Sequence, residues 1–185
     1  AGCSLDGNTV VDCAAGDGFS LAVDADGGVH ATGTNRSSAM GISYPPWCVT
    51  QLQRFQRVPI GDEDARWAVD ISERFDLDEA DALWSRGPRH ERVVSVACGT
   101  AHAICRTADG RVYTWGTYKD SNGYIGYMPG LQKQPTPREV EALAGKRMQA
   151  IASGADHTLA VSEDGYDVYA WGCGEKGQLG RDLKW

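Results

Sequence analysis

The chain has 185 residues, of which 42% are hydrophobic and 23% are charged, and this length is sufficient for one sizeable domain or two small ones with a hydrophobic core. Its net charge of −7 at pH 7 excludes a general electrostatic attraction to nucleic acid or anionic lipid, and no apolar run approaches the roughly 20 residues of a membrane-spanning helix. The 23 glycines favour a fold with many tight turns over one built from long helices.

Three stretches of the chain, residues 10–33, 93–116 and 148–172, repeat one pattern. Each has a short apolar strand, a glycine after two small residues, a second apolar strand, the pair Asp-Gly and a third strand that ends in glycine. Because Asp-Gly supplies the positive-φ residues of a tight hairpin, each stretch is predicted to form an antiparallel unit. One such unit cannot bury its own faces, so the copies are expected to stack as blades of an all-β propeller. A solenoid of β-units is the alternative architecture.

The first strand of every copy ends at a glycine, where we expect the backbone to turn sharply against its neighbour. Three residues later the second and third copies carry a histidine, and the first copy carries Phe19. We interpret both histidines as hydrogen-bonded structural residues rather than as metal or substrate ligands. The predicted structural residues of the repeat are Gly16, Gly99, Gly154, His102 and His157.

Residues 43–92 carry no repeat signature and are predicted to form an acidic insertion that packs partly on the propeller through its tryptophans. The acidic run at 76–84 lacks the glycine and the ligand spacing of an EF-hand, which favours a solvated turn or short helix. The expected division is therefore a first repeat at 1–42, the insertion at 43–92, a second repeat at 93–147 and a third repeat at 148–185.

The segments that follow the second and third copies differ in length. In the third copy, Gly172, Gly174 and Gly177 form a Gly-x-Gly-x-x-Gly string, but no crossover helix follows it, so we interpret it as a turn between blades rather than as a dinucleotide site. After the second copy, residues 117–130 are longer and aromatic, and they are predicted to form a projecting hairpin. An uncharged exposed run at 124–127 is typical of a contact patch.

The cysteine pattern indicates an intracellular protein without a metal site, and no cofactor is predicted. The six cysteines show no Cys-x-x-Cys pair, which favours reduced thiols in the core over a disulfide framework. The sequence Asn35-Arg36-Ser37 fits a glycosylation signal, and we interpret it as a chance match.

The third copy, with ASGADHTLAVSEDG and the following GCGEKGQLGRD, resembles the repeat of the regulator of chromosome condensation family. This family consists of seven-bladed β-propellers. The resemblance implies that the chain supplies about three blades and that the remaining blades lie on another polypeptide or in a missing segment. It covers all three repeat cores and leaves the insertion outside.

The stretch at 112–130 resembles the β-wedge, the hairpin with which this family performs nucleotide exchange on the small GTPase Ran. In that activity a hairpin with an Asp-x-Asn-Gly-x-Ile-Gly pattern presses on the phosphate-binding region of the GTPase. The resemblance therefore implies a guanine-nucleotide exchange factor that performs no covalent chemistry, has no catalytic residue and needs no cofactor. The implied partner-binding residues of the hairpin are Asp120, Ser121, Asn122, Gly123, Tyr124, Ile125, Gly126 and Tyr127.

The resemblance also implies an acidic residue in the loop before the repeat histidine. In the third copy Asp156 occupies that loop and takes this role. In the second copy Thr100 stands where the family has aspartate. A hydroxyl accepts a hydrogen bond but cannot form an ion pair with a basic partner residue, so the contact expected from Thr100 is weaker.

The resemblance further implies a nuclear protein, with a cytoplasmic pool as the alternative, that acts in nucleocytoplasmic transport, chromatin function and mitosis. Chromatin would be contacted through regions outside this chain, and no membrane is involved. A non-catalytic propeller that scaffolds protein interactions remains an open alternative, and it would tolerate loss of the hairpin. A hydrolase based on Asp156 and His157 is a weaker one, because neighbouring residues on a strand point to opposite faces.

Overall fold

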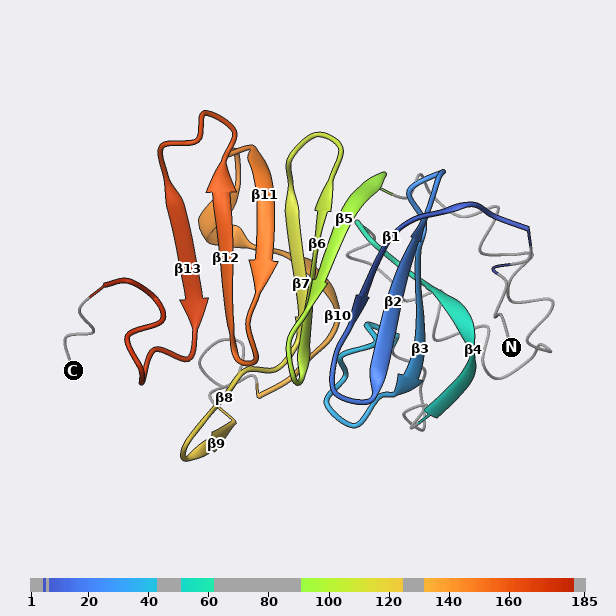
Figure 1. The fold of residues 1–185 in the computed structure, drawn as a ribbon, viewed down its shortest axis with the longest axis horizontal. Helices are drawn as coiled ribbons and strands as arrows, with labels where there is room; N and C mark the ends of the chain where they lie inside the picture. The colour runs from blue at the N-terminus through green and yellow to red at the C-terminus, as the bar shows by residue number, and fades with distance from the viewer. Residues whose placement is uncertain (1–4, 6, 43–50, 62–90, 125–131, 182–185) are drawn as a thin grey trace.

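A computed structural model describes residues 5, 7–42, 51–61, 91–124 and 132–181 of the chain. Within these ranges the structure contains thirteen strands and one short 3-10 helix, η1 (Glu141–Leu143), which confirms the all-β prediction. The strands form three antiparallel sheets that lie side by side, together with a two-stranded hairpin (Figure 1). None of the described segments forms a helix long and apolar enough to cross a membrane.

Each sheet follows the order predicted from its repeat, and two of the sheets gain an additional outer strand. The first sheet consists of β1 (Val10–Ala15), β2 (Phe19–Asp24), β3 (Val29–Thr34) and β4 (Gln51–Val58). The second consists of β5 (Val93–Cys98), β6 (His102–Thr107), β7 (Val112–Gly116) and β10 (Gln134–Glu139). The third consists of β11 (Met148–Ser153), β12 (His157–Ser162) and β13 (Val168–Gly172).

Strand β4 lies inside the segment 43–92 that the sequence assigns to the insertion. It pairs antiparallel with β3, with Val58 opposite Val29, so the first sheet extends beyond residue 42. Outer strands carry no motif of the repeat, and for this reason the boundary of the first blade is not visible in the sequence. The acidic run at 76–84 and the tryptophans of the insertion lie outside the described residues.

The first strands of the sheets lie close together, since β1 contacts β5 and β5 contacts β11. A hydrogen bond links the first two sheets directly, because Asp12 Oδ2 accepts the Val96 N–H at 2.9 Å. Backbone hydrogen bonds also join consecutive units: the Val93 N–H donates to Gly27 O at 3.0 Å, and the Met148 N–H donates to Gly110 O at 2.8 Å. The three sheets are therefore connected in sequence order, as blades are.

The repeat glycines are required for space and not for an unusual backbone conformation. A Cβ on Gly99 would lie 2.1 Å from His102 Cε1 and 2.6 Å from the carbonyl oxygen of Ala155. Gly16 and Gly154 have the same relation to the rings three residues later, Phe19 and His157, and none of the three has a positive φ. The expected sharp turn is present, since the N–H of each glycine donates to the carbonyl oxygen three residues later at 2.9 Å, and the missing Cβ also makes room for the ring of that residue.

The Asp-Gly pairs form the predicted hairpins at the opposite ends of the strands. Gly27, Gly110 and Gly165 have φ values of 87°, 85° and 79°, whereas the aspartates before them do not have positive φ. The left-handed conformation that these loops require is thus confined to glycine, which adopts it without steric cost.

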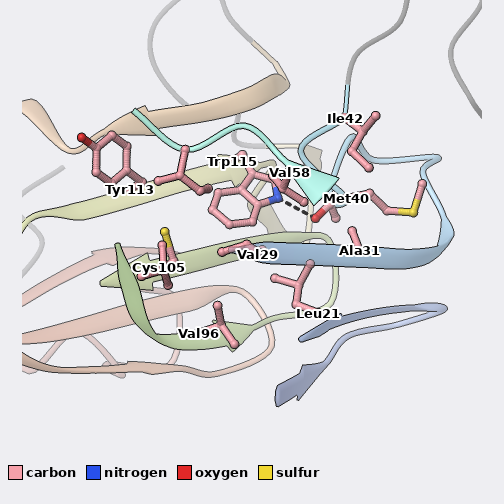
Figure 2. Close-up of a cluster of buried hydrophobic side chains, with 14 of the residues drawn as sticks. Leu21, Val29, Ala31, Met40, Ile42, Val58, Val96, Cys105, Tyr113 and Trp115 are labelled. Atoms are coloured by element: carbon pink, nitrogen blue, oxygen red, sulfur yellow. Dashed lines mark hydrogen bonds between the residues drawn. The ribbon is translucent and has the colours of Figure 1, made fainter. Parts of the chain in front are cut away.

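The main core lies between the first and second sheets, and Figure 2 shows its side chains. Trp115 of β7 is fully buried there, and its Nε1–H donates to the carbonyl oxygen of Ala39 at 2.7 Å. A second cluster between the second and third sheets includes Ile104, Met148 and Ala160. In each cluster, adjacent sheets contribute apolar side chains, and their burial against one another is the principal stabilisation between blades.

The glycosylation signal at Asn35 is a structural element of the loop after β3. Asn35 is buried, its Nδ2–H donates to Ile42 O at 2.9 Å, and its Oδ1 accepts the Met40 N–H at 3.1 Å. With both ends of its amide bonded inside the protein, Asn35 is not accessible for glycosylation in the folded state.

Candidate partner-binding site

A short hairpin leaves the second sheet after β7 and extends away from the three sheets (Figure 1). It consists of the antiparallel strands β8 (Lys119–Asp120) and β9 (Gly123–Tyr124), and we call these strands and their turn the projecting hairpin. The turn is closed by Asp120, whose Oδ1 accepts the Asn122 N–H at 2.8 Å. Gly123 follows with a φ of 119°, which residues with a Cβ rarely adopt.

The tip of the projecting hairpin is open to solvent. Ser121, Asn122 and Gly123 are exposed, and a Cβ on Gly123 would have no other atom within 4 Å. The tip is therefore accessible to a partner over the part of the segment that is described. Three residues that the sequence assigns to partner contact lie outside that part: Ile125, Gly126 and Tyr127.

The base of the hairpin is anchored between the second and third sheets by Tyr118, which is only 3% exposed. Its hydroxyl accepts the Nε1–H of Trp171 at 2.7 Å and lies 3.2 Å from Thr114 Oγ1 and 3.3 Å from Thr158 Oγ1. Its ring packs on that of His102, with 4.2 Å between the centroids. A buried hydroxyl with this many partners fixes the point at which the hairpin begins.

Asp156, in the loop between β11 and β12, lies beside the base of the hairpin. It is half-buried, and its Oδ1 accepts the Lys119 N–H at 3.1 Å. Its backbone oxygen accepts the Cys173 N–H at 2.7 Å, which holds the loop against the end of β13. Among the described residues no hydrogen bond joins Asp156 to His157, so the structure gives no support to a hydrolytic dyad.

Glu175 is a further residue at this site that the sequence reading missed. It follows β13 in the segment interpreted as a plain turn between blades, and its carboxylate accepts both the backbone N–H and the hydroxyl of Ser121. These two hydrogen bonds are the main cause that lowers the pKa of the exposed Glu175 carboxyl below its ordinary value. No local pattern predicts this contact, because the two residues belong to different repeats.

Thr100 lies in the loop between β5 and β6, and its backbone N–H donates to Ala155 O at 2.7 Å. The structure therefore brings Thr100 next to the loop that carries Asp156. The corresponding loop of the first sheet carries an exposed acid, Asp17, at the same distance after its repeat glycine as Thr100. The sequence reading omitted Asp17, although aligning the three copies at their glycines identifies it.

The repeat histidine His102 connects the second sheet to the third. It is fully buried, and its Nε2 lies 2.8 Å from Ser153 Oγ and 3.1 Å from Thr158 Oγ1. Burial, together with the nearby His157, lowers the pKa of His102 to about 4, so the ring is neutral at pH 7. Its Nδ1 has no hydrogen-bond partner within the described residues. This geometry fits a structural role.

The pH dependence of stability is expected to come partly from His102. In the unfolded chain a histidine binds a proton near pH 6.5, whereas folded His102 binds one only near pH 4. Its stabilising contribution is complete above pH 6.5 and is lost as the pH falls from 6.5 towards 4, by about 3 kcal/mol in total. The control is His102→Phe, since Phe19 occupies this position in the first sheet.

The measurement is the free energy of unfolding by urea at pH 7, 6, 5 and 4 for both proteins. His102→Phe is expected to start less stable, because Ser153 loses its contact with Nε2, but to lose about 3 kcal/mol less between pH 7 and pH 4. Parallel pH profiles for the two proteins would contradict the buried neutral imidazole.

The described residues contain no cluster of three or more His, Cys, Asp or Glu side chains that could hold a metal ion. Four of the cysteines lie in the described part of the chain and are free thiols: Cys13, Cys98, Cys105 and Cys173. Burial raises the pKa of the Cys98 thiol to about 12, so it is neutral and unreactive at physiological pH.

Comparison with known families identifies the repeat. Residues 109–161 match the family described as "Regulator of chromosome condensation (RCC1) repeat", and a second family with the same description matches residues 93–124 and 149–178. The crystal structure of Prp20p from Saccharomyces cerevisiae, which was described together with its binding to Gsp1p and histones, superposes with a TM-score of 0.71. The two chains are 26% identical, and the match covers 98% of this chain and 36% of that one.

Three curated relatives are similar to this chain in sequence. Regulator of chromosome condensation from Mus musculus is 44% identical over 49% of this chain and 21% of its own length. Guanine nucleotide exchange factor SRM1 from Saccharomyces cerevisiae is 30% identical over 94% of this chain and 36% of its own length. E3 ubiquitin-protein ligase HERC2 from Homo sapiens is 33% identical over 96% of this chain and 4% of its own length. The chain therefore spans well under half the length of each of these relatives.

Proposed function

Because this chain is a partial β-propeller of the regulator of chromosome condensation family, we propose that the protein containing it is a guanine-nucleotide exchange factor for a Ran-type small GTPase. The relatives support this reading, since one is named as a guanine nucleotide exchange factor and the solved structure was described with its binding to Gsp1p. The exchange occurs in the nucleus and serves nucleocytoplasmic transport and mitosis, and the histone binding described for Prp20p is the support for a chromatin location.

The observation that carries the proposal is the projecting hairpin, which is anchored at its base between the second and third sheets and extends away from them. Where the third repeat has a plain turn after its last strand, the second repeat has a hairpin with an exposed tip and a buried base. The hairpin is an addition to the second sheet, because β7 pairs directly with β10, the strand that follows the hairpin in the chain. A rigid element that leaves the body of a protein is suited to entering a partner.

An exchange factor accelerates nucleotide loss by binding the nucleotide-free GTPase more tightly than the loaded form. Each tenfold gain in release requires about 1.4 kcal/mol of that difference. The projecting hairpin would enter the phosphate-binding region and disturb the backbone that holds the phosphates and Mg²⁺. Since the hairpin is already ordered by its neighbours, little conformational entropy is lost on binding.

The carboxylates on this side of the propeller fit the charge of such a partner. A phosphate-binding region carries basic side chains, and these lose their counter-charge when the nucleotide leaves. The proposed contacts are two carboxylates, one hydroxyl residue and the hairpin tip with its aromatic continuation. They comprise Asp120, Asp156, Thr100, Ser121, Asn122, Gly123, Tyr124, Ile125, Gly126 and Tyr127.

Two substitutions at Asp156 separate its charge from its support of the hairpin. Asp156→Asn keeps an oxygen that can accept the Lys119 N–H but removes the negative charge, whereas Asp156→Ala removes both. If Asp156 pairs with a basic residue of the GTPase, loss of its charge is sufficient to slow exchange. Asp156→Asn is then expected to reduce the rate about 10- to 100-fold, the effect of losing one charged hydrogen bond.

The assay measures release of fluorescent GDP from the Ran-type GTPase by the complete propeller protein. Asp164→Asn, a carboxylate change in the loop between β12 and β13, is the matched control at the other end of the sheet. Wild-type rates for Asp156→Asn and reduced rates for Asp156→Ala would assign Asp156 to hairpin support alone. Absence of release by the wild-type protein would overturn the proposed function.

A non-catalytic scaffold is the second candidate, because the aligned part of HERC2 covers 96% of this chain within a protein named as a ubiquitin ligase. Both functions use the propeller as a binding surface. They differ in the assay above, since a scaffold gives no acceleration of GDP release at any concentration.

A further inference from the structure

The tip of the projecting hairpin is bonded to the third repeat by one side chain. The Ser121 N–H donates to Glu175 Oε2 at 3.0 Å, and the Ser121 hydroxyl donates to the other carboxylate oxygen, Oε1. Both donors of one residue thus meet both oxygens of one carboxylate. Such a two-point contact restrains direction as well as distance.

Glu175 is itself held at the end of the third sheet. Two residues earlier, the Cys173 N–H donates to Asp156 O at 2.7 Å, and Cys173 is buried. Two residues later, the Gly177 N–H donates to Gly174 O at 3.0 Å and closes a turn around Glu175. The carboxylate is therefore presented from a fixed loop, although the side chain itself is exposed.

Without Glu175, the outer part of the hairpin has no other hydrogen bond to the sheets in the part of the chain that is described. The remaining contacts with the third repeat lie at the base, where Tyr118 is buried and Asp156 accepts the Lys119 N–H. Among the residues that the structure describes, the hydrogen bond of the Asp120 side chain lies within the turn, to the Asn122 N–H. Base contacts fix where the hairpin starts, and Glu175 fixes where its tip lies.

We propose that Glu175 is a positioning residue for nucleotide exchange, which holds the tip of the projecting hairpin through Ser121 in the orientation that enters the GTPase. This inference rests on the proposed exchange function. It assigns a role to the third repeat as the support of an element that belongs to the second repeat, and it makes the angle of the hairpin depend on the contact between those two units.

The clamp has two measurable consequences in the complete propeller protein. Glu175→Gln weakens the acceptor, and so the Ser121 amide and its neighbours are expected to exchange with deuterium faster than in the wild type. The variant still binds the GTPase, but with the tip of the hairpin less well oriented, so the maximal rate falls as well as the affinity. We expect kcat for GDP release to fall about three- to tenfold, a range typical of one exposed hydrogen bond of this kind.

Ser121→Ala and the double variant show whether the two residues act together. Ser121→Ala removes the hydroxyl donor, and in the double variant the loss of exchange activity is expected to be clearly less than the product of the single losses. The matched control is again Asp164→Asn, because Asp164 Oδ1 accepts a serine hydroxyl, that of Ser162, and a backbone N–H, that of Tyr166, at the opposite end of β13. The control is expected to leave GDP release unchanged.

Hydrogen exchange and GDP release distinguish the possible failures. Unchanged deuterium uptake at residues 119–124 in Glu175→Gln overturns the clamp. Faster uptake with an unchanged kcat overturns its role in exchange. Independent, multiplicative losses in the double variant also overturn the coupling of Ser121 to Glu175. If the wild-type protein releases no nucleotide, it is the proposed function that fails, while the uptake experiment still decides whether the clamp exists.

Discussion

Replacing Trp115 with alanine is expected to lower the free energy of unfolding by about 3 to 5 kcal/mol, the range for truncating a large buried aromatic side chain. Trp115 is fully buried in the core between the first and second sheets (Figure 2). Its removal leaves a cavity there and also leaves the buried Ala39 carbonyl without the Nε1–H donor that now lies 2.7 Å away. Both losses destabilise the interface between the first and second sheets.

Trp171 provides the matched control because it occupies the same position in the third repeat but is only partly buried. Its Nε1–H donates to Tyr118, and the Tyr118 hydroxyl keeps Thr114 and Thr158 as neighbours when Trp171 is removed. Trp171→Ala is therefore expected to cost less than Trp115→Ala. The measurement is denaturant unfolding of the 185-residue chain, to which these burial values apply, and an equal or larger loss for Trp171→Ala would contradict the assignment of the main core.

The parts of the fold that were predictable from the sequence are those specified within one repeat. A glycine followed three residues later by Phe19, His102 or His157 is a local pattern, and so is an Asp-Gly pair between two apolar strands. These patterns specify a ring contact and a hairpin through short-range sterics alone. The physical reason for the first glycine was predictable only in part, because the sequence indicates the tight turn there but does not indicate that a ring packs on the glycine Cα.

The outer strands were not predictable in the same way. Strand β4 pairs with β3 after a connection at 43–50 that carries no motif, and β10 pairs with β7 after the hairpin. Pairing of this kind depends on which surface remains open in the assembled sheet. A segment with modest strand propensity becomes a strand because an edge is available, and this is a tertiary effect.

The candidate site likewise has features that the local sequence determines and contacts that only tertiary packing creates. The turn of the projecting hairpin was predictable, since Asp120 caps it locally and Gly123 supplies the positive φ. The contacts that hold it were not, because Glu175 and Asp156 come from another repeat and meet the hairpin only when the second and third sheets pack together. The resemblance to the family identified Asp156, whereas nothing in the sequence identified Glu175.

Removing the tip of the hairpin is expected to have the largest effect on exchange. Deletion of residues 121–127 leaves the buried anchor Tyr118 and the pairing of β7 with β10 in place, so the sheets are expected to fold normally. The deletion takes away the element that we propose enters the phosphate-binding region of the GTPase. A loss of at least about 100-fold in GDP release corresponds to about 3 kcal/mol of lost preference for the nucleotide-free GTPase.

The same deletion is the direct test of the exchange mechanism, through the rate of fluorescent GDP release from the Ran-type GTPase with the complete propeller protein. Equal thermal stability of wild type and variant is the control for folding. We expect rapid release by the wild-type protein and a rate close to spontaneous release for the variant that lacks residues 121–127. Wild-type release rates for that variant would contradict this mechanism, because the hairpin would then be dispensable for exchange.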